Sequence, residues 1–229
     1  KDFKKGLVPI FWPVIIICGL ILPADFSTAA ILLIVCFTMM FIGGAKLKHL
    51  VSIVGAAFVG FLFLILINMA FPGLLPRVDT WENRMMSYGS GNKQENYQAE
   101  MAKRAVANGF LFGKGPGKGH VKNDLYSAQS DFIFASSIEE FGSIIGGIGL
   151  LILYMILFFR AIRIMNKVES KFASHLVFGL SFMLIFQSFI NMGVGVNLLP
   201  VTGQPLPLIS MGGTSILFTC VSLGIILNV

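Results

Sequence analysis

Residues 172–229 read FASHLVFGLSFMLIFQSFINMGVGVNLLPVTGQPLPLISMGGTSILFTCVSLGIILNV, and these 58 residues contain no aspartate, glutamate, lysine or arginine. About 20 apolar residues are enough for a helix to cross the hydrocarbon core of a bilayer. The segment rich in proline and glycine, Asn197–Pro207, divides the stretch into two candidate spans, 172–196 and 206–229. Non-helical backbone at membrane depth is tolerated only inside protein or beside a wet cavity. Val196–Gly213 is therefore either an external hairpin or part of a cavity.

The rest of the chain has a similar composition. Hydrophobic residues make up 55% of the 229 residues and charged residues only 12%, whereas a soluble domain carries about a quarter charged residues. Four further uncharged runs are candidate spans: Gly6–Leu22 (short, with Pro9 and Pro13), Phe26–Ala45, Leu50–Phe71 and Phe141–Phe159. The sequence therefore predicts an all-α polytopic membrane protein with six transmembrane helices and one large external loop.

Basic residues gather in alternate connections between these runs. They precede the first run and separate the second from the third and the fourth from the fifth, whereas Pro23–Asp25 and Asn197–Pro207 contain none. By the positive-inside rule the basic connections are cytoplasmic, which places the C-terminus inside. The chain then has three parts: three helices in 1–76, an extracytoplasmic loop at 77–140, and three helices in 141–229. This placement also accounts for the net charge of +6 without nucleic-acid binding.

Within the external loop, Glu95–Asn108 has the spacing of a short amphipathic helix. Glu100 can pair with Arg104 at i,i+4, and Gly109 is a suitable terminator. The apolar positions share one face: Tyr97, Met101, Ala102 and Ala105. We interpret this segment as a helix lying on the membrane surface.

A glycine- and lysine-rich segment follows, reading GKGPGKGH from Gly113 to His120. Exposed backbone N–H groups and lysine side chains suit a phosphate or pyrophosphate. The spacing matches neither the nucleotide P-loop nor the dinucleotide fingerprint, and a flexible linker is the alternative interpretation. His120 could be a general base, although a lone loop histidine is more often only exposed polar surface.

The acid Asp131 lies where this polar loop meets an apolar run, in SAQSDFIFASSIEE from Ser127 to Glu140. An ionisable group at a membrane edge is costly unless it is solvated or paired, so Asp131 is a candidate catalytic base. We interpret Glu139 and Glu140 as capping charges at the start of the next helix. No Ser-His-Asp spacing, zinc pattern or redox cysteine pair is found. Polar residues inside the apolar runs are expected to form interhelical hydrogen bonds or a polar groove: Gln187, Asn191, Asn197, Ser210, Thr214 and Ser215.

Two motifs carry a resemblance to a known family. The run from Leu198 to Ser215, LLPVTGQPLPLISMGGTS, resembles the signature of the SEDS family, which comprises the FtsW, RodA and SpoVE proteins. SDFIFA from Ser130 and EEFG from Glu139 resemble its second motif, although Met211 and Gln129 replace residues common in the family. Looser matches lie at Gln98, Ala105, Asn108–Gly109, Gly113–Gly117 and Pro23–Ala29. Within the family, the sequence of the first motif is more similar to the FtsW branch than to the RodA branch.

The resemblance implies a fold of about ten spans, of which this chain would supply the last six. It also implies a peptidoglycan glycosyltransferase that polymerises lipid II on the outer face of the bacterial cytoplasmic membrane during division. The expected partners are a class B penicillin-binding protein and other divisome proteins. A divalent cation, Mg²⁺ or Mn²⁺, is an expected cofactor, with no metal ligands identified.

Within that expectation, Asp131 would be the general base. The substrate-binding residues would be Lys114, Gly115, Gly117, Lys118, Gln98, Arg84, Ser210, Gly212 and Gly213. Two other functions fit the same pattern: a lipid II flippase, and a non-catalytic scaffold for a penicillin-binding protein.

Overall fold

The computed structural model describes residues 8–22, 24–48, 50, 51, 55, 60, 93–119 and 128–229. It divides into two units, Lys1–Asn83 and Arg84–Val229, which are treated separately below. The described residues form helices and connections without a β-strand, which confirms the predicted all-α class.

The first unit begins with two apolar helices, α1 (Val8–Ile21) and α2 (Phe26–Ile42). Asp25 caps α2, because its Oδ1 accepts hydrogen bonds from the backbone N–H groups of Ser27 (3.0 Å) and Thr28 (3.2 Å). These helices match the first two predicted runs to within a few residues. Most of the predicted third run, Leu50–Phe71, lies outside the described residues, and its described positions are helical.

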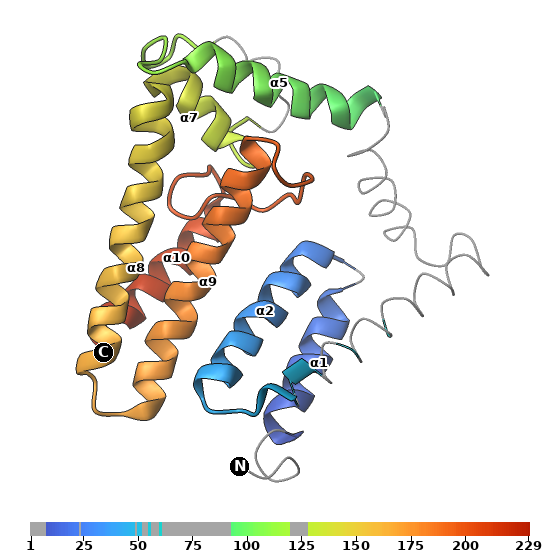
Figure 1. The fold of residues 1–229 in the computed structure, drawn as a ribbon, viewed down its shortest axis with the longest axis vertical. Coiled ribbons are helices and arrows are strands. Elements are labelled where there is room, and N and C mark those ends of the chain that lie inside the picture. Colours follow the sequence, from blue (N-terminus) through green and yellow to red (C-terminus); the bar gives the residue numbers. More distant parts are fainter. Residues whose placement is uncertain are drawn as a thin grey trace, which may run out of the picture. The chain divides into compact units, whose positions relative to one another are not determined.

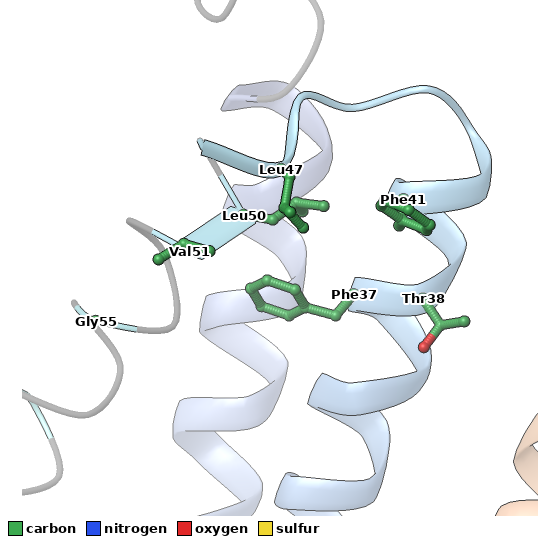
Figure 2. A pocket seen from close by; sticks show the side chains of 7 residues that line it. All are labelled: Phe37, Thr38, Phe41, Leu47, Leu50, Val51 and Gly55. Atoms are coloured by element: carbon green, nitrogen blue, oxygen red, sulfur yellow. The ribbon is translucent and has the colours of Figure 1, made fainter.

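A hollow of about 660 Å³ lies beside the second half of α2 (Figure 2). Among the described lining residues one carries a hydroxyl, Thr38, which donates to the backbone oxygen of Ile34 at 2.9 Å. All other lining residues are apolar: Phe37, Phe41, Leu47, Leu50, Val51 and Gly55. The hollow therefore offers shape and apolar surface, without a free polar group among these side chains.

The second unit contains five α-helices and one π-helical stretch among its described residues (Figure 1). Helices α8 and α9 run side by side in opposite directions, and α10 packs against α9. The Oγ of Ser170 accepts a hydrogen bond from the N–H of Ala173 and so caps α9. The elements are α5 (Lys93–Gly109), α7 (Ile133–Gly142), η2 (Ser143–Gly149), α8 (Leu150–Lys167), α9 (Lys171–Gly195) and α10 (Gly213–Asn228).

The chain reverses direction at Gly142, between α7 and η2. Gly142 has φ 82°, and a Cβ on Gly146 would lie only 2.2 Å from the backbone oxygen of Ser137. Residues nine apart in one straight helix would be separated by about 13 Å, so α7 folds back along η2. The predicted run Phe141–Phe159 therefore begins within two residues of η2, whereas the separate helix α7 before the turn was not predicted.

Two helical stretches, 133–167 and 171–195, are long and apolar enough to cross a membrane. In the first stretch, the part beyond the reversal consists of η2 with 7 residues and α8 with 18 residues. The other apolar helices among the described residues, α1, α2 and α10, are shorter than 18 residues. The count of six spans stays a prediction.

Helix α5 has the amphipathic pattern that the sequence predicts, and it ends at Gly109 as expected. The predicted ion pair is present, with 2.7 Å between Arg104 Nη2 and Glu100 Oε1. Protein covers three of the four positions on the apolar face of α5, whereas Tyr97 is 47% exposed, and the location of α5 on the membrane surface stays a prediction. Its buried residues Met101, Ala102 and Ala105 share one core with Ala128, Phe132, Ala135 and Val194.

Candidate active site

Hydrogen bonds hold three consecutive backbone carbonyls just before α7. The N–H of Met211 donates to the oxygen of Gln129 at 2.9 Å, and the hydroxyl of Ser210 donates to the oxygen of Ser130 at 2.6 Å. The side-chain amide of Asn191 donates to the oxygen of Asp131 at 2.9 Å. Three consecutive carbonyls are thus fixed by α9 and by the segment between α9 and α10. We call these three hydrogen bonds the carbonyl clamp.

The donors of the clamp are themselves fixed. Ser210 is 1% exposed, and its Oγ also accepts a hydrogen bond from the N–H of Leu206 at 2.6 Å. Asn191, also 1% exposed, donates a second hydrogen bond to the oxygen of Gln204 at 2.7 Å. Since Gln204, Leu206 and Ser210 are buried, this part of the segment is folded into the unit. It is therefore not a hairpin that projects away from the protein.

Further hydrogen bonds join the helices to the same segment. The side-chain amide of Gln187 donates to the oxygen of Pro205 at 3.1 Å, and the hydroxyl of Tyr154 donates to the oxygen of Pro207. For Gln187 the sequence suggested hydrogen bonds between helices or a polar groove. The acceptors are instead carbonyls of non-helical backbone, which must be satisfied when buried.

Asp131 lies at the end of the clamped backbone, directly before α7. The next residue, Phe132, is fully buried in the core with α5 and α9, whereas Asp131 itself is half-buried. A buried anchor on one side and three fixed carbonyls on the other restrict the backbone of Asp131. The backbone position of Asp131 is therefore set by the fold.

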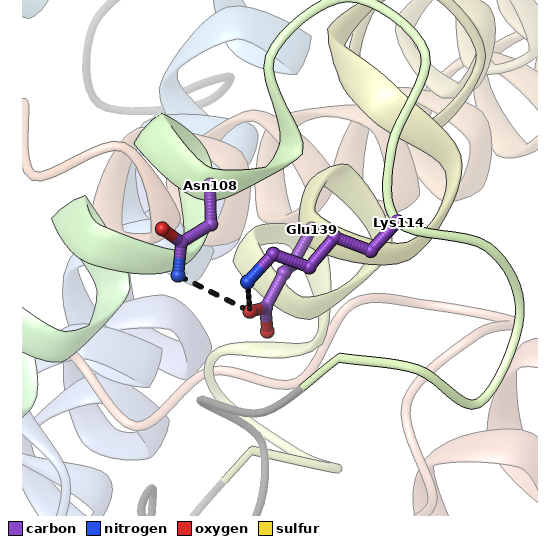
Figure 3. A network of polar contacts seen from close by, with 3 residues as sticks. All are labelled: Asn108, Lys114 and Glu139. Carbon is purple, nitrogen blue, oxygen red and sulfur yellow. Dashed lines mark hydrogen bonds and ion pairs between the residues drawn. The ribbon is translucent and has the colours of Figure 1, made fainter.

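The opposite end of α7 holds a different acid, Glu139, which is fully buried (Figure 3). Its Oε1 lies 3.3 Å from the Nζ of Lys114 and 3.3 Å from the Nδ2 of Asn108. The prediction of a capping charge is wrong, because Glu139 lies near the C-terminal end of α7 and not in its first turn. It joins α5, the glycine loop and α7.

The backbone of the glycine loop is bound to the protein. The N–H groups of Lys114 and Gly115 donate to the carbonyls of Glu139 and Glu140, each at 2.9 Å, and that of Gly117 donates to Glu140 Oε2 at 3.1 Å. These N–H groups are thus engaged by protein acceptors, which differs from the expected phosphate cradle. Lys118 is exposed, and the side chain of Lys114 is 32% exposed beside Glu139.

The glycine loop and Asp131 are also not neighbours. Lys114 contacts Glu139 near the C-terminal end of α7, whereas Asp131 precedes its N-terminal end. A helix of 10 residues is about 15 Å long, so the two features are separated by most of that length. Their proximity in the sequence does not translate into contact.

The remaining predicted residues are distributed over the unit. Gln98 is half-buried on α5, and Gly212 and Gly213 lie at the start of α10. Arg84 and His120 lie outside the described residues. In the part of the chain that the structure describes, no three His, Cys, Asp or Glu residues form a group suited to a metal ion. The substrate-binding roles of these residues stay predictions.

Sequence reasoning did not identify the carbonyl clamp or the role of Asn108. Asn191 and Ser210 were visible as polar residues in apolar runs, but their partners are 60 and 80 residues away in the chain. Only the fold brings these groups together.

The comparisons with known proteins agree in pointing to one family. The model of the FtsW/RodA/SpoVE family, described as cell cycle protein, matches residues 2–229. Stage V sporulation protein E of Bacillus subtilis is 34% identical over 238 residues, covering 100% of this chain and 61% of that protein. The probable peptidoglycan glycosyltransferase FtsW of Francisella salina is 35% identical over 237 residues, covering 100% of this chain and 56% of that protein. The chain thus spans little more than half the length of these relatives.

Two solved structures have similar folds. One is a chain from work described as structural coordination of polymerization and crosslinking by a peptidoglycan synthase complex. Its TM-score is 0.69 at 27% identity, covering 99% of this chain and 61% of that chain. The other is an aspartate-to-alanine mutant of the Thermus thermophilus rod shape determining protein RodA. Its TM-score is 0.60 at 25% identity, covering 96% of this chain and 55% of that chain.

Proposed function

Because this chain belongs to the FtsW/RodA/SpoVE family, we propose that it is the C-terminal part of a peptidoglycan glycosyltransferase that polymerises lipid II. Several relatives are named as probable enzymes of this class. The same proposal includes six spans, an extracytoplasmic loop at 77–140 and a location in the bacterial cytoplasmic membrane. It also includes membership of the FtsW branch and a role in division.

The observation that carries the proposal is the carbonyl clamp. A general base works when it is held within reach of the proton that it removes, and a pre-fixed backbone lowers the cost of that positioning. The clamp uses three donors from two distant segments to fix the residues up to Asp131, while leaving its side chain half-buried.

In the proposed reaction, Asp131 accepts the proton of the acceptor sugar's 4-hydroxyl. The hydroxyl oxygen then forms a bond to C1 of the donor sugar, as the bond from C1 to the pyrophosphate oxygen breaks. Undecaprenyl pyrophosphate leaves with the bonding electron pair. Negative charge thus shifts from the acceptor oxygen to the pyrophosphate, where nearby cations would stabilise it.

Two kinds of cation could stabilise the charge on the leaving pyrophosphate: a lysine side chain and a divalent metal ion. Lys118 is exposed at the other end of α7, while Lys114 is already paired with Glu139. The expected Mg²⁺ or Mn²⁺ has no donor group of three residues in the described part of the chain, so no step is assigned to it. Polymerisation with and without EDTA, followed by Mg²⁺ or Mn²⁺, measures whether the reaction needs the ion.

The partner in this proposal is a class B penicillin-binding protein, with other divisome proteins in the same assembly. A solved neighbour comes from a complex described as coordinating polymerization and crosslinking. Tests of activity should therefore use the full-length protein together with such a partner.

The deciding experiment replaces Asp131 by asparagine, which keeps the size of the side chain and removes its basicity. General bases contribute about 10²- to 10⁴-fold, so we expect at least a hundredfold loss of lipid II polymerisation in proteoliposomes. The melting temperature and partner binding should stay unchanged. Glu100→Gln is the matched control, because it removes an exposed carboxylate on α5 and should retain wild-type activity.

Assays in the same proteoliposomes distinguish the glycosyltransferase from the flippase and the scaffold. Glycan chains of near-normal amount from Asp131→Asn would refute the assignment of the base. If wild-type protein reoriented lipid II across the bilayer without polymerising it, the flippase would replace the enzyme. If neither occurred while the crosslinking partner was still activated, the scaffold would be the better function.

A further inference from the structure

Basic side chains gather where α8 turns into α9, at the end of α8 that is remote from η2 (Figure 1). Glu169 is the only acid that follows Glu140 in the sequence, and it lies in the same turn. Four positive charges and one negative charge give residues 160–171, which we call the basic turn, a net charge of +3. Its four cationic residues are all exposed: Arg160, Arg163, Lys167 and Lys171.

The backbone of the basic turn is held by the fold. The hydroxyl of Ser174 donates to the backbone oxygen of Met165 at 3.2 Å, which joins the start of α9 to the end of α8. On the protein side of the turn, Ala161 of α8 and Val177 of α9 are buried in one core with Ile226 of α10. The helices that carry the four cations therefore have fixed positions relative to one another.

The face of α8 that carries three of these cations becomes apolar further from the turn. Leu153 is 61% exposed and Ile156 is 50% exposed. Together with Arg160, Arg163 and Lys167 they follow spacings of 3, 4, 3 and 4 residues, which place all five on one helix face. The face thus has an apolar half and a basic half, and the basic half is about 10 Å long.

Aromatic rings lie beside the cations. The guanidinium carbon of Arg163 is 4.8 Å from the centre of the Phe159 ring, and this phenylalanine is 56% exposed. Phe172, at the start of α9, is 77% exposed. Long cationic side chains at a membrane boundary keep their charge in the polar layer while their stems and the neighbouring rings contact hydrocarbon. The basic turn has this combination of groups.

The cations are not neutralised by the acids near them in the sequence. Within the described residues, the ion pairs lie elsewhere, between Arg104 and Glu100 and between Lys114 and Glu139. Clusters of lysine and arginine at the cytoplasmic end of a transmembrane helix bind the phosphates of anionic lipids. The positive-inside rule accounts for cations at this end, but not for their alignment with exposed apolar residues on one face.

That alignment selects the ligand. A nucleic acid or a free phosphate would use only the basic half and would leave Leu153 and Ile156 without a partner. A phospholipid would use both halves, because its phosphate can bind the cations while an acyl chain lies along the apolar side chains. Helix α8 belongs to a helical stretch that is long and apolar enough to cross a membrane, so lipid is the expected neighbour of this face.

We propose that this face of α8, with the basic turn, binds one phospholipid whose headgroup has a net negative charge. Arg160 and Arg163 donate hydrogen bonds to its phosphate oxygens, and Lys167 and Lys171 add positive charge. The site does not depend on Asp131 or on glycosyl transfer. In the predicted orientation it lies in the cytoplasmic leaflet, whereas the proposed reaction takes place on the outer face.

The test measures binding of tetraoleoyl cardiolipin to the full-length protein in neutral detergent, by native mass spectrometry and by thermal unfolding. Each lysine or arginine near an anionic headgroup changes the affinity about fivefold, so Arg160→Gln/Arg163→Gln should weaken binding about 10- to 30-fold. The matched control, Lys46→Gln/Lys48→Gln, removes two exposed cations from another connection and should leave cardiolipin binding unchanged. Equal binding by the two double variants would overturn the proposal.

Further variants and lipids make the test specific. Dioleoyl phosphatidylcholine should raise the melting temperature of wild type and of Arg160→Gln/Arg163→Gln equally, because it has no net charge. Arg160→Lys/Arg163→Lys keeps both charges and should retain most of the cardiolipin affinity. Without added lipid, each variant should unfold at the wild-type temperature, because the substituted side chains are exposed. If the glutamine variant unfolds early, Lys167→Gln/Lys171→Gln takes its place with the same expected loss.

Other occupants of this face give different results, and each would overturn the proposal. Equal stabilisation by soluble tripolyphosphate would indicate a free-anion site, and displacement of cardiolipin by an oligonucleotide would indicate nucleic acid. Tighter binding of undecaprenyl phosphate than of cardiolipin would indicate the carrier lipid. A full-length protein that retains no cardiolipin would show that another protein segment covers the face.

The outcome is separable from that of the proposed enzyme. Asp131→Asn should bind cardiolipin as wild type does, whether or not wild type polymerises lipid II. Loss of cardiolipin binding in Asp131→Asn with an unchanged melting temperature would show that the lipid binds at the candidate active site, and would refute the site on α8.

Discussion

The two ends of α7 hold acidic residues in opposite ways. At the N-terminal end, three protein donors bind the backbone carbonyls and leave the side chain of Asp131 half-buried. At the C-terminal end, the carboxylate of Glu139 is fully buried and is itself the group that binds Lys114 and Asn108. At the N-terminal end the backbone is fixed and the acidic side chain stays partly accessible. At the C-terminal end the acidic side chain itself fixes a loop. Burial and hydrogen-bonding pattern, more than residue type, separate the two roles.

The largest expected effect comes from breaking the C-terminal end at Gly142. An alanine there would need φ 82° and would bring its Cβ within 2.2 Å of the backbone oxygen of Leu111. Left-handed strain and a backbone clash together should cost at least about 3 kcal/mol. We expect Gly142→Ala to lose folded protein in detergent, as measured by size-exclusion chromatography and thermal unfolding.

Gly224→Ala is its control. Gly224 lies within α10, and a Cβ there would meet nothing within 4 Å. Since alanine is favoured over glycine in helices by up to about 1 kcal/mol, this variant should be at least as stable as wild type. Equal stability of the two variants would contradict the account of the turn.

An intermediate effect is expected at the N-terminal end from Ser210→Ala. The change leaves the N–H of Leu206 and the carbonyl of Ser130 without their common partner. Leaving a buried polar group unsatisfied costs about 1–3 kcal/mol, and the looser backbone should also lower kcat. The melting temperature and the polymerisation rate measure the two consequences.

Ser222→Ala removes an exposed hydroxyl that only bonds within its own helix, to the carbonyl of Phe218, and should change neither quantity. If Ser210→Ala lost stability but kept full kcat, the clamp would be structural only. The positioning of Asp131 would then need another explanation.

The smallest expected effect comes from Glu139→Gln, which keeps the size of the side chain and removes its charge. Breaking a fully buried pair costs more, but Lys114 is 32% exposed and can turn to water, so we expect a loss of about 1–2 kcal/mol. Lys114→Met should cost more than Glu139→Gln, because it removes a cationic partner of the fully buried carboxylate. The double variant should cost less than the sum of the two single variants. Additive losses in thermal unfolding would show that the pair is not coupled.

Sequence reasoning predicted the helical class, α5 and its ion pair, the first two helices and the family. Each depends on local pattern: apolar run length, i,i+4 spacing or a contiguous motif. It missed the reversal at Gly142, because the apolar composition continues unchanged through a turn made possible by one glycine. It also misassigned Glu139, because capping is judged from nearby residues while burial depends on a loop 25 residues earlier.

The candidate site could likewise be predicted only where a local sequence pattern marks a residue. Asp131 is marked by its position at the edge of an apolar run, and the polar residues of the signature segment were recognised as unusual. That Asn191 and Ser210 bind the carbonyls beside Asp131 could not be deduced, because hydrogen bonds between segments 60 and 80 residues apart depend on the whole packing. The same reason explains why the glycine loop, close in sequence, lies at the other end of α7.

The 80-residue separation of Ser130 and Ser210 has a consequence for biosynthesis. Ribosomes add about 5–20 residues per second, so Ser130 waits roughly 4–16 s before its hydrogen-bonding partner exists. During that interval the carbonyls next to Asp131 must be satisfied by water or by other proteins of the insertion machinery. The end of α7 that carries Asp131 is therefore completed late in translation, after α8 and α9 have been made. A ribosome that stalls before residue 210 leaves a chain without α10 and without two of the three hydrogen bonds of the carbonyl clamp.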